Sequence, residues 1–398
     1  MDEAGFLKAR GTEIVTAHGK SVVLKGVNLG GWLMMEGYIL HSLNLPEQRF
    51  KKNFVKALGK LQLADFEKEF RNHFIEEKDI RRMAHFGFNC IRVPFNYRLV
   101  EKKPYRYDRK GLSYLDRVIR WAEKYHVWVI LDLHAAPGAQ NHDWHSDSNG
   151  TADFWTKKDF QKRTFALWEF LADRYKNKTA VAGYDLLNES VIDDAIKLNR
   201  FYKDLIRQIR HVDKNHILFV EGNQWARDLG CLDDLRDDNL VLSIHTYQPL
   251  DFTFNFVPDL SYPTAHRNKA RPQEILIGYK RISKKRSVPI YVGEFGVNFR
   301  RGLYGEDRWL YDMLSVFKDF GFHWTYWTYK AIKNSIFPDG IFSFVDNPPW
   351  VNRQGPLLGW DTYHLYWPTR KKEMIQSWRT DSFKENKEIS KILKDAAK

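Results

Sequence analysis

Two short apolar stretches of the chain each end on a carboxylate. The stretch 182–190, AGYDLLNES, stops at Asn188 and Glu189, and the stretch 289–296, PIYVGEFG, stops at Glu294. A pair of carboxylates can divide acid–base work, because one can keep a proton while the other stays ionised. The two strand ends therefore predict one catalytic pair, provided that the fold brings Glu189 and Glu294 together.

Other polar and aromatic residues also stand where apolar stretches end. Each has a structural explanation on its own, such as a rim ion pair for an arginine or a buried hydrogen bond for a histidine. Six different strand ends that supply such groups to one face are harder to explain by packing. The candidate substrate-binding or supporting residues in this set are Arg92, His134, Asn188, His245, Tyr247 and Trp327.

The elements that must position these residues alternate along the chain. Short stretches rich in β-branched and aromatic residues predict parallel strands that are covered on both faces. Between them, segments such as GLSYLDRVIRWAEKY carry apolar residues at three-and-four spacing and predict helices that pack on the sheet. The predicted strands are 22–28, 90–94, 127–134, 183–189, 216–221, 240–245, 289–294 and 322–327.

Eight strands that alternate with helices favour an α/β protein with a single (β/α)8 (TIM) barrel, in which the strand C-termini face a common centre. A doubly wound sheet is the alternative, but NLGGWL at 28–33 lacks the glycine pattern of its phosphate-binding turn. Residues 1–398 then form one domain, with a hairpin over 1–21 that plugs the bottom of the barrel and a final helix over 374–398. Long connections at 30–63, 249–271 and 330–368 predict tall walls around a pocket.

The ordered set of strand-end residues resembles glycoside hydrolase family 5, whose two catalytic glutamates end the fourth and seventh barrel strands. The stretches KGVNLGGWLMMEGYI and LDLHAAPGAQN, with Gln248 after the His-x-Tyr pattern, are similar to its exo-β-1,3-glucanase branch. The resemblance extends from about residue 22 to residue 367. Ser190 and the stretch HDWHSDSNGTADFW depart from the expected pattern and leave the substrate open.

The resemblance implies a role for each candidate residue. Glu189 is the implied acid/base, with a pKa raised by the neighbouring negative charge, and Glu294 is the implied nucleophile, kept ionised by Arg92. When two carboxyl groups are about 5–5.5 Å apart, the second attacks directly and stereochemistry is retained. Asn188 is implied to hydrogen-bond the sugar's 2-hydroxyl, and Tyr247 to hold Glu294 in position. His245 would orient Glu189 or Tyr247, and His134 would bind another sugar hydroxyl. Trp327 would provide a flat surface under the sugar ring at the cleaved position.

Further aromatic residues are candidates for outer subsites. Trp144 is one, and His142 and His145 flank it in a polar loop, where they either contact sugar hydroxyls or are simply solvated. No metal or cofactor is expected, because the histidines do not form a ligand spacing such as H-E-x-x-H. The tryptophans for which core or loop packing is the competing explanation are Trp32, Trp144, Trp155, Trp225, Trp350 and Trp360.

These observations predict a retaining β-glycosidase that acts on β-glucans or β-gluco-oligosaccharides, with exo action of the exo-β-1,3-glucanase or β-glucosidase type. A β-mannosidase, an endo-β-1,4-glucanase and a glycolipid or aryl glycosidase are alternatives on the same fold. A barrel that binds carbohydrate without catalysis is a further alternative, which the presence of both glutamates disfavours. The substrate partner in the main prediction is an oligosaccharide or glycoside.

Composition limits the other functional classes. The formal net charge is +13, but the basic residues are spread along predicted helices, so we expect no nucleic-acid partner. No apolar run is long enough to span a membrane, so no membrane partner is expected. Cys90 lies in a predicted strand and, with Cys231, provides no disulfide framework. The start of the sequence shows no secretory signal, which predicts a cytoplasmic location, or a secreted one if a leader has been removed.

Overall fold

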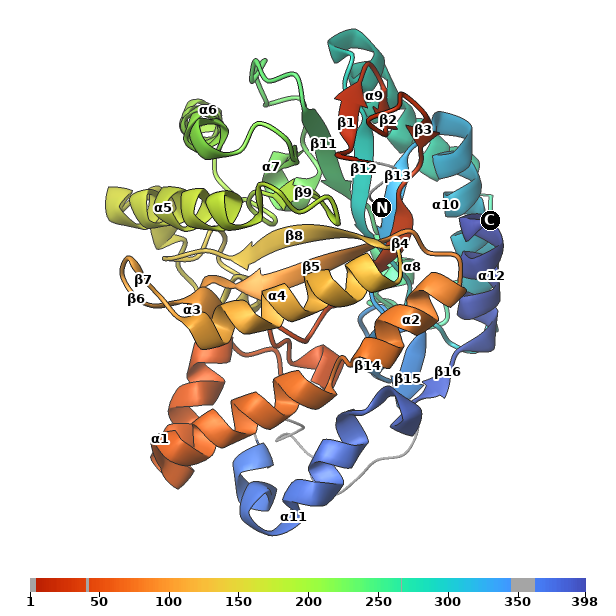
Figure 1. Cartoon of the computed structure of the whole chain (residues 1–398). Coiled ribbons are helices and arrows are strands. Elements are labelled where there is room, and N and C mark those ends of the chain that lie inside the picture. The colour runs from red at the N-terminus through yellow and green to blue at the C-terminus, as the bar shows by residue number, and fades with distance from the viewer. Residues whose placement is uncertain (1–4, 41–42, 266, 345–361) are drawn as a thin grey trace.

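A computed structural model describes residues 5–40, 43–265, 267–344 and 362–398, and within it eight parallel strands close into a barrel. The barrel closes where β13 pairs with β4 through Trp324 and Lys25. This confirms the predicted (β/α)8 fold (Figure 1). In chain order the barrel strands are β4 (Lys25–Asn28), β5 (Cys90–Asn96), β8 (Trp128–Ala135), β9 (Val181–Asp185), β10 (Ile217–Glu221), β11 (Leu240–His245), β12 (Ile290–Phe295) and β13 (His323–Tyr326).

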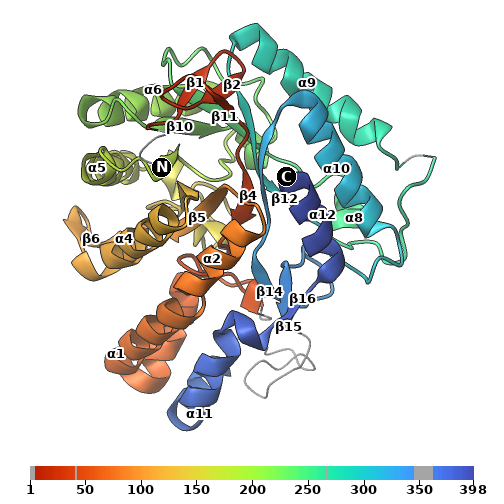
Figure 2. The same cartoon turned by 45° about the vertical axis from the view of Figure 1, so that its right-hand side comes forward.

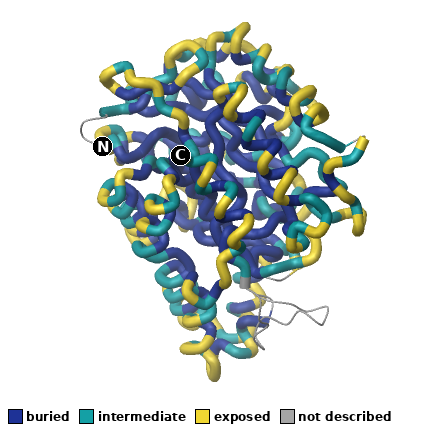
Figure 3. The backbone as a smooth tube through the Cα atoms, turned by 90° about the vertical axis from the view of Figure 1, so that its right-hand side faces the viewer, coloured by how far each residue is buried: buried dark blue, intermediate teal, exposed yellow. Residues whose placement is uncertain are grey.

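Helices surround the barrel and bury one face each against it. In α4 the residues Leu112, Leu115, Val118 and Ile119 are buried, as their three-and-four spacing predicted. Burial is therefore deepest in the strands and the inner helix faces, while exposed residues lie on the periphery (Figure 3). The covering helices are α2 (Glu77–His85), α4 (Arg109–Lys124), α5 (Lys158–Tyr175), α6 (Ala195–Val212), α9 (Ala270–Arg286), α10 (Glu306–Phe320) and α12 (Lys387–Ala397). No helix of the described chain is both long and apolar enough to cross a membrane.

The N-terminal end of the barrel is covered by a small antiparallel sheet. It has three strands, β1 (Lys8–Arg10), β2 (Glu13–Val15) and β3 (Ser21–Val22), where the sequence predicted a two-stranded hairpin. Leu7 and Ile14 from this segment pack against inward-facing barrel residues such as Cys90. Val22 was predicted to start the first barrel strand but pairs with Ile14 instead, because the chain turns before Lys25.

Two long connections contain helices that the sequence analysis treated as loops. The connection predicted at 30–63 contains most of α1 (Glu47–His73), and the one at 330–368 runs into α11 (Tyr363–Trp378). These two helices lie side by side next to the barrel (Figures 1 and 2), with Phe66 packed on Trp367 at 5.1 Å between ring centroids. The helix predicted over 374–398 is interrupted between α11 and α12, where β16 (Lys384–Glu385) pairs with β15 (Phe342–Phe344).

The fourth barrel strand is shifted relative to its prediction. It was expected at 183–189 but ends at Asp185, so Asn188 and Glu189 lie in the loop that follows β9. The pairing with β10 explains the strand's position, since Gly183 lies opposite Ile217 and a Cβ on Gly183 would be 2.1 Å from the Ile217 carbonyl oxygen. The loop still directs Glu189 toward the centre of the C-terminal face.

Candidate active site

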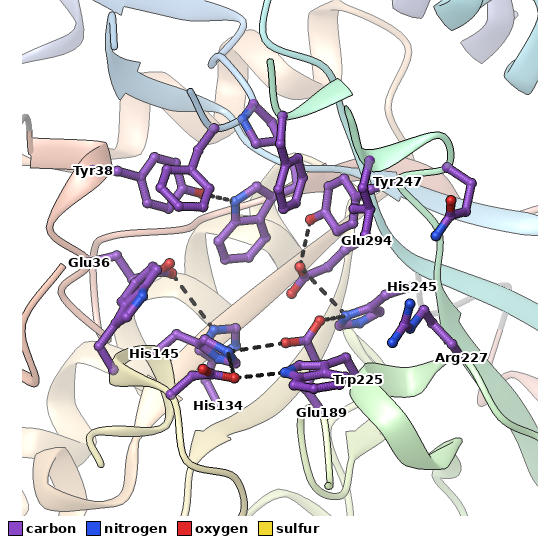
Figure 4. Close-up of a pocket in the computed structure, with 18 of the residues that line it drawn as sticks. Glu36, Tyr38, His134, His145, Glu189, Trp225, Arg227, His245, Tyr247 and Glu294 are labelled. Atoms are coloured by element: carbon purple, nitrogen blue, oxygen red, sulfur yellow. Dashed lines mark hydrogen bonds and ion pairs between the residues drawn. The ribbon is translucent and has the colours of Figure 1, made fainter. Parts of the chain in front are cut away.

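The carboxyl ends of the barrel strands surround a pocket of about 400 Å³ (Figure 4). A cavity of this size, with apolar rings and a few convergent polar groups, is typical of a small-ligand site. Its walls come from the loops that follow several different barrel strands. Most of the sequence-predicted site residues line it, namely His134, Trp144, Glu189, His245, Tyr247, Glu294 and Trp327.

Glu294 is held at both carboxylate oxygens. Nη1 of Arg92 donates a hydrogen bond to Oε1 at 2.7 Å, and the hydroxyl of Tyr247 donates to Oε2 at 2.7 Å (Figure 4 shows the second contact). The side chain of Arg92 is completely buried. A buried guanidinium and a phenol hydroxyl both stabilise the ionised carboxylate and fix its orientation.

Glu189 is positioned by a different set of partners. Its Oε1 lies 2.7 Å from Nδ1 of His245, and its Oε2 lies 3.4 Å from Nε2 of His145. Its backbone N–H donates to Oε2 of Glu221 at 2.6 Å, and its φ of 49° is in the left-handed region that residues other than glycine rarely adopt. The strained backbone is therefore anchored by a buried carboxylate, and the side chain points at the pocket.

The two glutamates converge. A carboxylate oxygen of Glu189, a ring nitrogen of His245 and a carboxylate oxygen of Glu294 all lie within 4.8 Å of one another. A nearest-oxygen separation below 4.8 Å is closer to the roughly 5–5.5 Å spacing of a pair that attacks directly than to the roughly 6.5–9.5 Å spacing that makes room for a water molecule. The spacing instead suits direct attack by one carboxylate while the other donates a proton.

A buried charge network supports the pair from below. Arg92 donates from Nε to Asp185 at 2.8 Å and from Nη2 to Glu221 at 3.0 Å, and its Nη2 lies 3.1 Å from Asp132. Burial and the charge of Glu221 together outweigh the attraction of Arg92 and raise the pKa of Asp185 to about 8. One guanidinium thus contacts several acidic groups. Protonation of Asp185 neutralises part of their negative charge.

Asn188 and Arg92 lie behind the pocket lining and contact each other there. Oδ1 of Asn188 accepts a hydrogen bond of 2.8 Å from Nη2 of Arg92, and Asn188 is completely buried. Among the described residues, Nδ2 of Asn188 has no hydrogen-bond partner. A buried donor without a protein partner is uncommon in a folded protein, and this one lies next to Glu189.

The electrostatics of Glu189 differ from the sequence-based expectation of a raised pKa. Burial does push the pKa of Glu189 upward, but the hydrogen bond with His245 and the positive charges of His145 and His245 outweigh it and lower the pKa to about 2. Burial lowers the pKa of His245, but the charges of Glu221 and Glu294 and the bond with Glu189 raise it well above its usual range. The histidines next to Glu189 therefore carry the protons, and Glu189 is ionised.

His134 and Trp327 form the opposite wall. Burial lowers the pKa of His134 to about 3, so its ring is neutral at neutral pH. Nδ1 of His134 lies 2.8 Å from Oδ2 of Asp132, and the ring is stacked on Trp327 with 5.6 Å between centroids and 7° between planes. The indole N–H of Trp327 donates to the hydroxyl of Tyr38. The result is a flat wall with a neutral imidazole at its edge.

The structure places His142 outside the pocket lining, as the solvated alternative for this residue expects. His142 is exposed, and its Nδ1 lies 3.3 Å from the carbonyl oxygen of Gly150. A short 3₁₀ turn, η2 (Trp144–Ser146), directs His145 inward instead.

Sequence reasoning missed several residues of the site. Glu221 ends β10 and would have been found by the same strand-end rule that selected the others. Glu36 lies within the quoted stretch KGVNLGGWLMMEGYI, but no periodicity indicates where its side chain points. The lining residues outside the predicted site list are Glu36, Tyr38, Asp143, His145, Trp225, Arg227, Gln248, Leu250, Phe254, Phe256, Phe337 and Pro338.

The remaining tryptophans divide between the pocket and the core. Trp225 lines the pocket and donates from Nε1 to Asp143 at 2.7 Å. Trp32 and Trp155 are buried and donate to backbone carbonyls, which makes them packing residues. Trp350 and Trp360 lie outside the described residues.

Known proteins resemble this chain across most of its length. The family model for cellulase (glycosyl hydrolase family 5) matches residues 51–333. A beta-xylosidase of Phanerodontia chrysosporium is 35% identical over 82% of this chain and 71% of its own. Endoglucanase C of Acetivibrio thermocellus is 28% identical over 78% of this chain and 92% of its own, and a glucan 1,3-beta-glucosidase of Blumeria graminis is 32% identical over 56% and 55%.

Solved structures share the fold. The crystal structure of a glycoside hydrolase superposes with a TM-score of 0.64 over 94% of this chain and 99% of its own, at 19% identity. Cel5A of Thermotoga maritima in complex with mannotriose superposes with a TM-score of 0.61 over 80% and 92%, at 20% identity. With the family model covering more than half of the chain and a relative above 30% identity, the chain belongs to glycoside hydrolase family 5 and is a glycoside hydrolase.

Proposed function

We propose that this enzyme is a retaining, exo-acting β-glycosidase that removes a single sugar from the end of β-gluco-oligosaccharides. The observation that carries the retaining mechanism is the approach of Glu189 and Glu294, whose nearest carboxylate oxygens lie within 4.8 Å. Glu294 attacks the anomeric carbon while Glu189 protonates the leaving oxygen, and in the second step Glu189 takes a proton from water.

Each supporting residue has a function in this reaction. Arg92 and Tyr247 keep Glu294 ionised and aimed, and Nδ2 of Asn188 is free to bind the hydroxyl at C2, where contacts strengthen as the oxocarbenium-like state forms. Trp327 offers its ring face to the sugar at the cleaved position. His134, neutral and buried, is suited to a hydrogen bond with a further hydroxyl.

Three aromatic rings from three loops close one side of the pocket and favour exo action. The ring centroid of Phe337 lies 4.7 Å from that of Tyr38 and 6.2 Å from that of Trp144. The ring centroids of Tyr38 and Trp144 are 5.9 Å apart. This cluster, which we call the ring barrier, stands beside Trp327. A chain bound with one sugar on Trp327 meets the barrier on that side, which favours a terminal residue over an internal one.

A β-xyloside is the second candidate substrate, favoured by the 35% identity to a relative named beta-xylosidase. Glucosides and xylosides differ only in the exocyclic hydroxymethyl group, so one apolar pocket discriminates weakly between them. The gluco-configured oligosaccharide is our first choice because of the motifs 25–39 and 131–141, which resemble the exo-β-1,3-glucanase branch.

Hydrolysis of a panel tests the proposal. The panel holds aryl β-glucoside, xyloside, mannoside and galactoside, followed by laminari- and cello-oligosaccharides with analysis of the products. We expect the glucoside to be among the best aryl substrates and oligosaccharides to lose one sugar at a time. Glu294→Gln and Glu189→Gln are expected to remove hydrolysis of the preferred aryl glycoside with the fold intact, since each removes a group that reacts. Normal rates in both variants contradict the proposal, and internal cleavage contradicts exo action.

A further inference from the structure

The free oxygen of Glu189 faces a second histidine that sequence reasoning did not assign. His245 occupies Oε1 at 2.7 Å, so Oε2 is the oxygen that can meet a leaving group. Nε2 of His145 lies 3.4 Å from this Oε2 and 3.6 Å from Oδ2 of Asp143 (Figure 4). Asp143 is fixed in turn by the 2.7 Å hydrogen bond from Nε1 of Trp225.

The two histidines around Glu189 sit in unequal surroundings. His245 faces three carboxylates, because its ring nitrogens also lie 3.3 Å from Glu221 and 3.6 Å from Glu294. Its side chain is only 1% exposed, so neighbouring charges hold it as a fixed cation. Its proton is therefore bound too firmly to pass to Glu189.

His145 is placed differently. Asp143 and Glu189 lie within ion-pair distance, Glu36 approaches from the loop after β4 with a pKa that burial raises well above its usual range, and the neutral ring of His134 on β8 lies 6.1 Å away. Its side chain is 14% exposed, more than that of His245. Burial lowers the pKa of His145, but the contact with Asp143 and the charges of Glu189 and Asp143 raise it to about 9.

We propose that His145 is a positioning residue that shares one proton with Glu189 Oε2 and so supplies the protonated acid for glycoside cleavage. The inference rests on the proposed role of Glu189 as acid/base. In the free enzyme the proton is on Nε2 of His145 and Glu189 is a carboxylate. When a sugar enters and excludes water, an ion pair becomes less favourable, the N–H bond breaks and an O–H bond forms on Oε2, which leaves two neutral partners.

The remaining steps conserve protons. Glu189 gives the shared proton to the leaving oxygen and becomes a carboxylate beside neutral His145. In the second step it takes a proton from the attacking water, and this proton then returns to His145 when the product leaves. Since the pair loses its proton only when His145 does, activity extends to a higher pH than Glu189 alone would allow.

The test compares His145→Gln with His142→Gln, a matched variant on the same loop whose side chain is exposed and outside the pocket. The rates kcat and kcat/KM are measured against pH with two aryl glycosides of the preferred sugar. A phenyl glycoside needs protonation of its leaving group, and a dinitrophenyl glycoside needs little. Thermal unfolding of both variants checks that they are folded.

For His145→Gln we expect the high-pH limb of kcat/KM for the phenyl glycoside to move to lower pH by about one unit or more. The rate on this substrate is expected to fall by roughly tenfold or more, and the rate on the dinitrophenyl glycoside to fall far less. For His142→Gln we expect the pH profiles on both substrates to match those of the wild type. An unshifted limb in a folded His145→Gln, or an equal loss on both substrates, overturns the proposal. A wild-type enzyme that cleaves no glycoside of the panel contradicts the proposed function instead.

Discussion

Nη1 of the completely buried Arg92 lies 2.7 Å from Oε1 of Glu294 at the base of the pocket. The same guanidinium also donates to Asp185, Glu221 and Asn188, so its planar fork orders several acidic groups at once.

Arg92→Lys keeps the charge but loses this fork. We expect kcat to fall by about 10²-fold or more and the free energy of unfolding to fall by about 3 kcal/mol, because buried carboxylates lose donors. Steady-state kinetics and chemical denaturation measure the two effects. Arg207→Lys, which changes an exposed pair held to Asp204 through one guanidinium nitrogen, is the control and is expected to be close to wild type. Near-normal kcat in Arg92→Lys would refute the role of the fork.

Phe337→Ala opens the ring barrier. Removing the Phe337 ring leaves the contact between Tyr38 and Trp144 but takes away the third ring of the barrier, so longer chains gain room beyond the terminal sugar. We expect products longer than one sugar to appear from laminari- or cello-oligosaccharides, measured by chromatography. The neighbouring exposed Ile336→Ala serves as the control, because Ile336 is not part of the barrier. Unchanged single-sugar release in Phe337→Ala would argue against the barrier as the source of exo action.

His323, which lies away from the active site, makes the free energy of unfolding sensitive to acid. Its Nδ1 accepts a hydrogen bond from the backbone N–H of Leu24 at 3.0 Å, and burial lowers its pKa to about 3. Between pH 3 and about 6.5 the unfolded chain binds a proton that the folded chain does not, so stability falls as pH falls through this window.

His323→Gln keeps an acceptor for Leu24 but removes the titration. We expect the decrease in the free energy of unfolding between pH 6.5 and about 4.5 to be smaller in the variant by on the order of 1–2 kcal/mol. Urea denaturation at several pH values measures it, with the exposed His18→Gln as the control. Parallel curves for His323→Gln and wild type would contradict the prediction.

Lys330, on β14 (Lys330–Ile332), joins the ends of α1 and α11 through one buried amino group. Its Nζ donates to the carbonyl oxygens of Phe74 and Trp378 and to the hydroxyl of Thr380. Lys330→Met leaves these acceptors unpaired in the interior, and we expect a loss of about 2–4 kcal/mol in the free energy of unfolding. Lys371→Met, at the more exposed contact with Asp65, is the control. A melting temperature equal to wild type in Lys330→Met would contradict this account.

The strand-end residues could be predicted from the sequence because a closed barrel converts the end of each strand into one face. Arg92, Tyr247 and Glu294 meet for this reason, although they are far apart in the chain. The rule is also tolerant of boundary errors, since Glu189 reaches the site from a loop after the observed end of β9. Had the rule been applied to every predicted strand, it would have included Glu221.

Residues on the loops could not be placed in the same way. The choice between His142 and His145 depends on one 3₁₀ turn, which is set by contacts of the loop and not by its polar composition. The helix α1 was missed because Gly59, with φ of 85°, interrupts it, although Phe50, Phe54, Phe66 and Phe70 fall on one buried side. The pKa of Glu189 depends on the hydrogen bond with His245 and on the charge of His145, and the position of neither ring relative to Glu189 could be derived from the sequence.

The anomeric configuration of the first product tests the central claim most directly. This configuration depends on whether Glu189 and Glu294 are close enough for Glu294 to attack the sugar itself. Proton NMR can follow the anomeric signal of the sugar released from an aryl β-glycoside within the first minutes, before mutarotation. Direct attack by Glu294 predicts that the β-anomer appears first and the α-anomer only later. An α-anomer formed first would mean that water attacks the sugar directly, and it would contradict the account.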